Sequence, residues 1–326
     1  MEVGITIAGV GMVNPLGVGS LAVAAAARAG INQYNDSHVI GDNGEPIKMA
    51  RVPAPCLPEL SEDAPLQKQK LYALILKLGV LGLTEACEAA SVETLTPIFL
   101  ALPEQRCGRP FPALEPMLKD LNKQVDFPMD LLTSRIYTTG RAGGFNALSE
   151  ACELLLSTPL ETAIVGGIDS FDDAVLLKML DAEKRITGSN TMDGFVPGEG
   201  AAFIVLKKVA NPNLMLHKPG LGNEPGHYYS DEVCLGEGLS VAVESAVQNA
   251  NLAEPLQTVM CSLNGESIHG KEWGVAFTRN NNAFSTDFKV EHPADCYGDL
   301  GAATVPTLLG LSFVGLQKGY YNSPLM

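Results

Sequence analysis

Two apolar segments bordered by glycines place the strongest constraint on the fold of this chain. Thr162 to Gly166 is apolar and predicts a strand that ends at Gly166-Gly167. Gly194 to Gly200 predicts a glycine-rich loop, and this loop enters a second strand over Ala201 to Leu206. The two strands follow each other closely in sequence, so the chain must contain a sheet with a buried centre.

Strand-like and helix-like segments alternate through the rest of the chain. Further strands are predicted at Ile5–Val10, Pro97–Leu102, Arg135–Thr139 and Thr258–Leu263. Helical spacing of apolar residues predicts helices over Ser20–Ala29, Leu71–Ala90, Phe145–Leu155, Phe171–Asp181, Leu239–Asn251 and Asp299–Val314, while Glu272–Arg279 is helical or extended. This alternation predicts α/β layers with mainly parallel strands.

Two polar segments interrupt the alternation. Asn32 to Pro65 is broken by glycine and proline and predicts an irregular excursion. Asn211 to Asp231 is rich in Pro, Gly, Asn and His and predicts a connection between two halves of the chain. We therefore expect an N-terminal half over residues 1–209 and a C-terminal half over residues 210–326.

Charge and composition exclude several classes of partner. The 326 residues are 46% hydrophobic and 18% charged, which suits a globular α/β protein with a large core. The net charge of −15 repels nucleic acid and anionic membranes, so neither is an expected partner. An acidic carrier protein would also be repelled unless a local basic patch met it.

The N-terminus and the cysteines favour a cytoplasmic location. Met1 to Gly11 has no positive leader, and the apolar stretch Leu71 to Leu83 is interrupted by Lys77 and too short to span a bilayer. The seven cysteines are scattered singly, without a CxxC pair, which indicates a reducing compartment and argues against a zinc site or disulfides. We expect no metal and no cofactor.

Two glycine-rich segments are similar to nucleotide-binding loops, but each lacks residues that such a loop requires. Gly9-Val10-Gly11 follows a strand, but Asn14 stands where the third glycine of a dinucleotide loop belongs. Gly194 to Gly200 lacks the Lys-Ser/Thr ending of a phosphate loop and leads into a strand. A structural turn is the favoured interpretation of the second segment.

Four segments in order resemble the β-ketoacyl synthases. They are Gly4–Gly17 (GITIAGVGMVNPLG), Thr139–Ala151 (TGRAGGFNALSEA), the pair Ala163–Ser170 and Gly194–Leu206 (AIVGGIDS, GFVPGEGAAFIVL), and Cys296–Ala303 (CYGDLGAA). The resemblance implies the thiolase-like fold, a five-layer α/β/α/β/α arrangement of two similar halves. Compared with that family the C-terminal half looks short at its end, Asn322–Met326, so we expect either absent last strands or a truncation.

The resemblance also shows which residues occupy the family's catalytic positions. The nucleophilic cysteine at a helix start corresponds to Arg141, and arginine cannot form a thioester. The two catalytic histidines correspond to Asn264, which Glu266 follows closely, and to Asp299. A carboxylate at Asp299 would oppose the negative charge that develops during condensation. We therefore expect a vestigial site of Arg141, Asn264 and Asp299, with Glu266 beside it, and no catalytic residue.

Replacing the triad in this way predicts an ion pair. Arg141 and Asp299 should converge, with Glu266 as a second available carboxylate. The alternative is that Arg141 points to solvent and Asp299 caps the following helix. Cys152 lies further along the helix that follows Arg141 and is expected in the core. A reactive pair formed by Cys296 and His292 is an alternative to the absence of any catalytic residue.

These expectations favour a catalytically inactive binding, scaffold or adaptor protein. Leu100–Pro110 and Leu263–Ala276 resemble degenerate thiolase-like proteins found with bacterial secretion-system effectors, which implies an effector or its adaptor as partner. One alternative is an acyltransferase or thioester hydrolase with altered chemistry, and another is the non-catalytic subunit of an active ketosynthase. An open strand edge at Ser134–Thr139 predicts a homo- or heterodimer through this segment.

Overall fold

A computed structural model describes residues 3–61, 70–105 and 114–321 of the chain. Part of the Leu100–Pro110 stretch, residues 106–110, and the final residues Asn322–Met326 lie outside this description. The same holds for the last residues of the predicted excursion over Asn32–Pro65.

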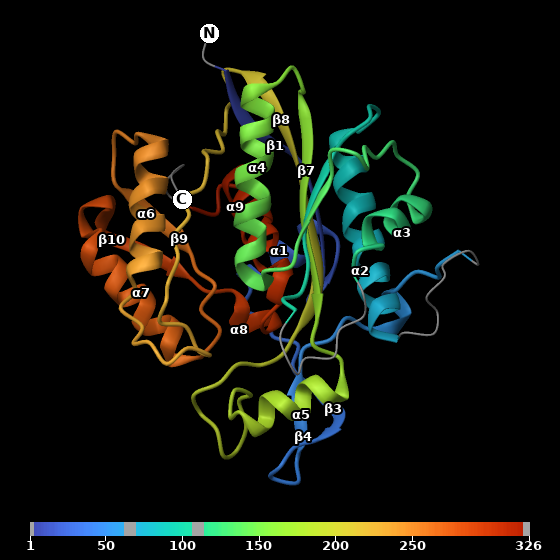
Figure 1. The fold of residues 1–326 in the computed structure, drawn as a ribbon, viewed down its shortest axis with the longest axis vertical. Coiled ribbons are helices and arrows are strands. Elements are labelled where there is room, and N and C mark those ends of the chain that lie inside the picture. The colour runs from blue at the N-terminus through green and yellow to red at the C-terminus, as the bar shows by residue number, and fades with distance from the viewer. Residues whose placement is uncertain (1–2, 62–69, 106–113, 322–326) are drawn as a thin grey trace.

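A six-stranded sheet forms the centre of the molecule (Figure 1). Its spatial order is β2 (Gly17–Val18), β1 (Val3–Asn14), β8 (Glu199–Ala210), β7 (Thr162–Ser170), β5 (Ile98–Ala101) and β6 (Arg135–Tyr137). β5 is parallel to both β6 and β7, but β8 is antiparallel to β7 and to β1. The prediction of mainly parallel strands is therefore wrong for the longest pairs, because the chain turns back after β7 and re-enters the sheet beside it.

Helices cover both faces of this sheet. On one face lies α2 (Lys70–Ala90), whose apolar side builds a core with β5 and β8, and α3 (Met117–Gln124) packs beside it. The other face carries α4 (Gly143–Ser157) and α9 (Thr304–Gln317), which form a second core with β1, β7 and β8. The first helix, α1 (Ser20–Arg28), packs against α9.

A second, smaller sheet lies beyond the α4 and α9 layer. It pairs β9 (Leu256–Met260) in parallel with β10 (Phe284–Glu291), and α6 (Glu237–Ala250) and α7 (Ser267–Arg279) accompany it (Figure 1). Trp273 of α7 packs edge-on against Phe284, with ring centroids 5.8 Å apart, while Met260 of β9 contacts the second core. The structure thus has the expected α/β/α/β/α layers, but the second sheet has two strands in the described residues against six in the first.

The predicted excursion over Asn32–Pro65 contains regular structure. β3 (Asn35–Ile40) and β4 (Pro46–Met49) form an antiparallel hairpin, and η1 (Ala54–Cys56) follows it. Val39, Ile47 and Met49 pack against α5 (Ala174–Ala182) in a third core. The hairpin was missed because only alternate residues of its strands are buried, so the short apolar signal is diluted by polar positions and by the turn between them.

Short 3-10 turns precede the two central helices. Glycines with positive φ introduce both turns: Gly140 (φ 59°) starts η2 (Gly140–Ala142) before α4, and Gly301 (φ 51°) starts η4 (Gly301–Ala303) before α9. The helix predicted from Asp299 therefore starts later, at Thr304. The remaining short elements are α8 (Ala294–Tyr297) and η3 (Asn281–Ala283). Among the described helices, none combines the length and apolar character needed to cross a bilayer.

Candidate functional site

The three predicted vestigial positions lie on loops at element ends. Arg141 lies in η2, directly before α4, and Asn264 follows β9. Asp299 lies between α8 and η4. Although these positions are far apart in sequence, the structure brings all three side chains into contact, because the ends of both sheets and the starts of both central helices meet here.

The predicted ion pair between Arg141 and Asp299 is present. The Nη2 group of Arg141 donates to Oδ2 of Asp299, and the two side chains are 24% and 4% exposed. Arg141 therefore does not swing to solvent. Asp299 does not cap α9, which starts at Thr304, so that part of the alternative is wrong; its Oδ1 instead accepts a hydrogen bond from the Gly301 N–H at 2.8 Å in the turn that precedes the helix.

The position of Arg141 explains the need for a nearby carboxylate. A helix N-terminus carries a partial positive charge, so an arginine directly before α4 is in an unfavourable place. The Asp299 carboxylate offsets both the guanidinium charge and the helix dipole. In this arrangement the start of α4 holds a cation–carboxylate pair instead of a nucleophile.

Asn264 links this pair to Glu266. Its Nδ2 group donates to Asp299 Oδ2 at 2.8 Å and to Glu266 Oε2 at 3.0 Å. Its Oδ1 accepts the backbone N–H of Glu266 at 3.1 Å, which fixes the orientation of the amide. An amide suits this position because it can donate to two carboxylates at once, while a neutral imidazole has one N–H.

Glu266 pairs with an arginine that the sequence analysis missed. Arg185, after α5, holds the Glu266 carboxylate with both ends of its fork: Nε to Oε1 at 2.7 Å and Nη2 to Oε2 at 2.9 Å. Its Nη1 donates to Tyr229 Oη at 2.8 Å, and its guanidinium lies 4.3 Å from the ring centre of Tyr228. No spacing rule connects these residues, which come from separate loops, so only the fold reveals the pair.

The electrostatics of Glu266 follow from these contacts. Burial by itself would raise the pKa of the carboxyl, but hydrogen bonds from His269 and Arg185, the Arg185 charge and the Asn264 amide lower it well below its usual value. Burial opposes protonation of His269, yet its contacts with Glu266 and Glu272 raise its pKa overall. Glu266 is thus held as an anion.

We call Arg141, Asp299, Asn264, Glu266 and Arg185 the five-residue polar network. Its two guanidinium cations balance its two carboxylates, and the amide joins them. The cavity beside Asn264 and Asp299 has a volume of about 10 Å³, room for about one water molecule. The network therefore leaves little space beside Asn264 and Asp299, and it contains no thiol or hydroxyl group.

The glycine-rich segment Gly194–Gly200 positions both ends of the network. Gly198 N–H donates to Asp299 O at 2.9 Å, and Phe195 N–H donates to Arg185 O at 2.8 Å. A Cβ at Gly198 would lie 2.6 Å from the Tyr297 carbonyl oxygen, so only glycine permits this approach. The segment has a structural role, but it is extended and not the turn that its sequence indicated, because Phe195 and Pro197 form bridge pairs with Ile186 and Asp299.

Glu199 within this segment is buried and has a structural role. It accepts hydrogen bonds from the Val52 N–H and the Ser170 hydroxyl, each at 2.8 Å, and so ties β8 to β7 and to the loop after β4. Burial raises its pKa to about 7. The glutamate lies away from the network and makes no contact with it in the described residues.

The other candidate nucleophiles are inert. Cys152 is fully buried in the second core, as predicted, and burial raises the pKa of its thiol to about 12. Cys296 is also buried, and its Sγ faces the Ala27 carbonyl oxygen at 3.8 Å. His292 pairs with Asp295 at 2.8 Å, so the alternative Cys296–His292 pair is not formed.

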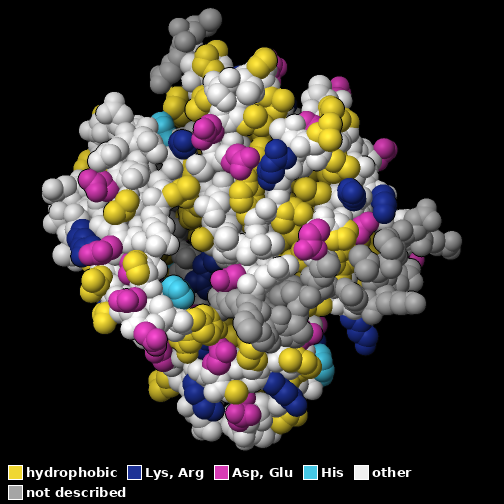
Figure 2. All heavy atoms as spheres, viewed as in Figure 1, with side chains coloured by type: hydrophobic (Ala, Val, Ile, Leu, Met, Phe, Trp, Pro, Cys, Tyr) yellow, Lys and Arg dark blue, Asp and Glu magenta, His cyan; other side chains and the backbone are white. Residues whose placement is uncertain are grey.

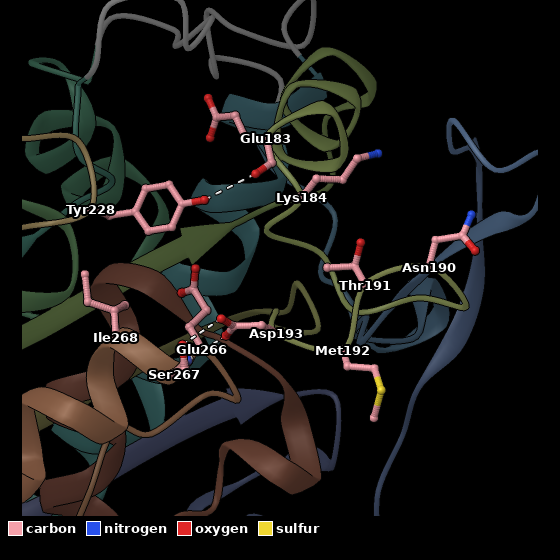
Figure 3. Close-up of a pocket in the computed structure, with 10 residues that line it drawn as sticks. All are labelled: Glu183, Lys184, Asn190, Thr191, Met192, Asp193, Tyr228, Glu266, Ser267 and Ile268. Carbon is pink, nitrogen blue, oxygen red and sulfur yellow. Dashed lines mark hydrogen bonds between the residues drawn. The ribbon is translucent and has the colours of Figure 1, made fainter.

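A surface pocket borders the network on its Glu266 side (Figure 3). It has a volume of about 390 Å³, and acidic groups dominate the titratable part of its lining: Glu183, Asp193 and Glu266 against Lys184. Asp193 reaches across to Ser267, whose N–H and hydroxyl both donate to it at 2.6 Å. The view in Figure 2 shows a hollow between the part of the molecule built from α6, α7, β9 and β10 and the central body.

Comparison with known proteins agrees with the fold. The family model "Beta-ketoacyl synthase, N-terminal domain" matches residues 133–211, which include Arg141 and the glycine-rich segment. No curated protein matches the chain. A large set of solved structures does, at low sequence identity.

Three of these structures illustrate the likeness. An oxazolomycin ketosynthase domain of Streptomyces albus JA3453 has a TM-score of 0.75 at 16% identity, with 97% of this chain and 63% of that chain covered. The ishigamide ketosynthase/chain length factor has a TM-score of 0.78 at 14% identity, covering 98% and 87%. A ketosynthase in complex with its chain length factor from Xenorhabdus doucetiae has a TM-score of 0.71 at 15% identity, covering 97% and 84%. This chain thus spans less than two thirds of the first of these.

The fold and the matched segment define the class of the protein. The chain has the thiolase-like fold of the ketosynthases. Its sequence matches the model of the β-ketoacyl synthase N-terminal domain over residues 133–211, and the likeness over the rest of the chain is one of fold.

Proposed function

We propose that this protein is a ketosynthase-like protein that does not condense acyl groups and acts by binding another protein. The observation that carries the proposal is the Arg141–Asp299 pair at the start of α4. Condensation needs a thiolate at this helix start and neutral donors facing it. Here the position holds a cation, and the facing groups are an amide and a buried carboxylate.

The size of the adjoining cavity supports the same proposal. A ligand pocket for a small molecule usually has a volume of about 300–1,000 Å³. The cavity beside Asn264 and Asp299 has about 10 Å³, so the space directly against these two side chains is too small for an acyl chain, and the pocket of about 390 Å³ lies on the Glu266 side of the network. The loss of activity would then be steric as well as chemical.

The first prediction is that the purified chain forms no acyl adduct at Arg141. Incubation with an acyl thioester, followed by intact-mass analysis, should show the unmodified mass, and malonyl-thioester decarboxylation should stay at background. An active ketosynthase serves as the positive control for adduct detection. A wild-type adduct or measurable turnover would favour the acyltransferase or hydrolase alternative.

A second candidate function is that of a non-catalytic subunit beside an active ketosynthase. Two of the similar structures are named as a ketosynthase with a chain length factor. In this chain β6 is the edge strand of the large sheet, and Leu132 just before it is 90% exposed, while Phe145 of α4 is 42% exposed. An open edge with nearby apolar side chains favours association with a second subunit.

The second prediction concerns this surface. We expect a dimer, homo- or heteromeric, through the segment Ser134–Thr139. If it is a homodimer, light scattering at micromolar concentration should show twice the chain mass, and Leu132→Glu should shift it towards the monomer. Met192→Glu is a matched control, since Met192 is 94% exposed and lies on a different loop. A wild-type monomer would point to a heteromeric partner, and a monomer that also fails to bind any ketosynthase would contradict the prediction.

The identity of the partner separates the two candidate functions. Affinity purification from the native cell should recover an active ketosynthase if the chain is a partner subunit. Recovery of a secretion-system effector, or of its adaptor, would instead support the adaptor role suggested by the resemblance.

A further inference from the structure

Three chain segments that join a small lobe to the large sheet cross at one buried side chain. The lobe consists of the hairpin β3–β4 and helix α5, whose apolar side chains form the third core, and it lies at the lower end of the view in Figure 1. The three segments are residues 50–52 after β4, residues 171–173 between β7 and α5, and the residues that lead from α5 into β8. Glu199 lies where they meet.

Glu199 holds the segments together through its two carboxyl oxygens. Oε1 accepts the Val52 N–H and Oε2 accepts the Ser170 hydroxyl, each at 2.8 Å. A backbone hydrogen bond runs beside them, from the Ala50 N–H to Pro197 O at 2.8 Å. We call Glu199, Val52 and Ser170 the clasp, because their contacts fasten the connections of the lobe to the end of the sheet.

The clasp buries a carboxyl group without a paired cation. Glu199 is 2% exposed, and none of the described cationic side chains forms an ion pair with it. Arg51, next to Val52, instead faces Asp172 at 4.0 Å and donates to the backbone oxygen of Asp36. Asp172 adds a like charge near Glu199, and its own Oδ1 is buried without a hydrogen-bond partner in the described part of the chain. Ionising Glu199 while the lobe is closed is therefore unfavourable.

The other elements around the clasp present apolar groups or groups that are already engaged. α2 covers this face of the sheet with the apolar side chains of the first core, and the Tyr72 hydroxyl among them donates to Asp120. Asp169 of β7 accepts the Ala302 N–H at 2.9 Å, so its carboxylate is turned towards η4. Burial, opposed in part by the two hydrogen bonds of the clasp, accordingly raises the pKa of Glu199 to about 7.

We propose that Glu199 is a proton-controlled clasp: with its proton bound the lobe stays closed on the sheet, and loss of the proton lets the lobe open locally so that water reaches the carboxylate. Opening also affects the pocket beside the polar network. Ile186 and Phe195 belong to the third core, and Arg185 directly precedes Ile186, so an open lobe loosens the pair of Arg185 with Glu266. The proposal goes beyond the binding role given above, and either can fail without the other.

The direction of the pH dependence follows from the burial of the carboxyl group. In the open lobe Glu199 is hydrated, and its pKa returns to its usual value of 4.5. The closed form is therefore favoured at low pH, and this advantage is lost as the pH rises from 4.5 through 7. Opening should become about tenfold more frequent per pH unit across this interval and should then level off.

Amide hydrogen exchange of the full chain measures the opening. The readout is the protection factor, which corrects for the base catalysis of exchange, at Val52 and at the paired amides of β3 and β4. Between about pH 5 and about pH 6.5 these factors should fall about tenfold per pH unit, and above about pH 7 they should stay level. The carboxyl-carbon NMR signal of Glu199 should titrate with a midpoint near pH 7.

Variants assign the effect to Glu199. Glu199→Gln keeps the shape of the side chain and cannot ionise, so its protection factors should not depend on pH. His269→Gln removes another group whose pKa is raised above 6.5, but one that lies outside the lobe, so it should keep the wild-type dependence. Asp172→Asn removes a like charge and should lower the midpoint of Glu199, whereas Arg51→Gln removes a cation and should raise it.

Three results would overturn the proposal. One is a Glu199 midpoint near its usual value of 4.5, since the carboxyl group would then be ionised in the closed lobe at neutral pH. Another is protection of the β3 and β4 amides equal to that of β5 at every pH, because the lobe would then open only when the whole protein unfolds. The third is a Glu199→Gln variant that keeps the wild-type pH dependence.

Discussion

Replacing Arg185 by alanine is expected to lower the free energy of unfolding by about 3–5 kcal/mol, the usual cost of removing one partner of a buried ion pair. The side chains of Arg185 and Glu266 are 9% and 3% exposed, so the pair is largely shielded from water. Glu266 would keep the Asn264 amide and His269, which do not match the two hydrogen bonds of the fork. The loss of packing against Tyr228 adds to the cost.

Urea unfolding of matched variants measures this effect. Arg185→Lys keeps the charge but loses the two-pronged geometry, so it should fall between wild type and Arg185→Ala. Arg279→Ala is the control, because Arg279 and Glu237 form an exposed pair 3.8 Å apart, and its loss should cost less than about 1 kcal/mol. An Arg185→Ala variant as stable as this control would show that the buried pair contributes little.

The Arg185–Glu266 pair should also affect how the free energy of unfolding depends on pH. The pKa of Glu266 is lower in the folded protein than its reference value of 4.5, so its contribution to stability is present above that pH and is lost as the pH falls through the folded pKa. His269 has the opposite sign: its pKa is raised above 6.5, so its contribution is present at lower pH and is lost as the pH rises through the folded pKa. Arg185→Ala should therefore flatten the loss of stability below about pH 4.5, because Glu266 no longer gains as much from being ionised.

The sequence predicted one end of the network and missed the other, for a physical reason. The resemblance to the β-ketoacyl synthases places Arg141 and Asp299, because the small-residue segments around them align with that family's catalytic loops. Arg185 lies in a loop after α5 that is held by backbone contacts with Phe195, and no periodic pattern in the sequence indicates these contacts. Tyr228 and Tyr229 reach it from the connecting segment, which has no periodic pattern.

The direction of the strands could not be predicted from local sequence either. Apolar runs identified β7 and β8 as strands, but a run buried on both faces does not encode whether its neighbour is parallel. The register of this pair, from Thr162 opposite Lys207 to Ser170 opposite Glu199, is antiparallel because of the path of the chain through α5. The hairpin of β3 and β4 was missed because it buries only one face.

Replacing Arg141 by alanine should lower the free energy of unfolding by about 3–5 kcal/mol, and Asp299→Asn should cost less. Alanine leaves the Asp299 carboxylate, 4% exposed, without its cation, although the Asn264 amide and the Gly301 N–H still donate to it. Asparagine keeps one acceptor oxygen for the guanidinium and leaves no buried anion.

A double-mutant cycle distinguishes an orphaned charge from lost packing. If the cost of Arg141→Ala comes from the uncompensated carboxylate, then adding Asp299→Asn should recover much of the lost stability, because the buried anion is removed. If the cost comes from the volume that Arg141 fills before α4, the two changes should add. Recovery would show that the start of α4 is held by charge compensation. In that case a thiol at position 141 could not simply be restored, because Asp299 would have to change with it.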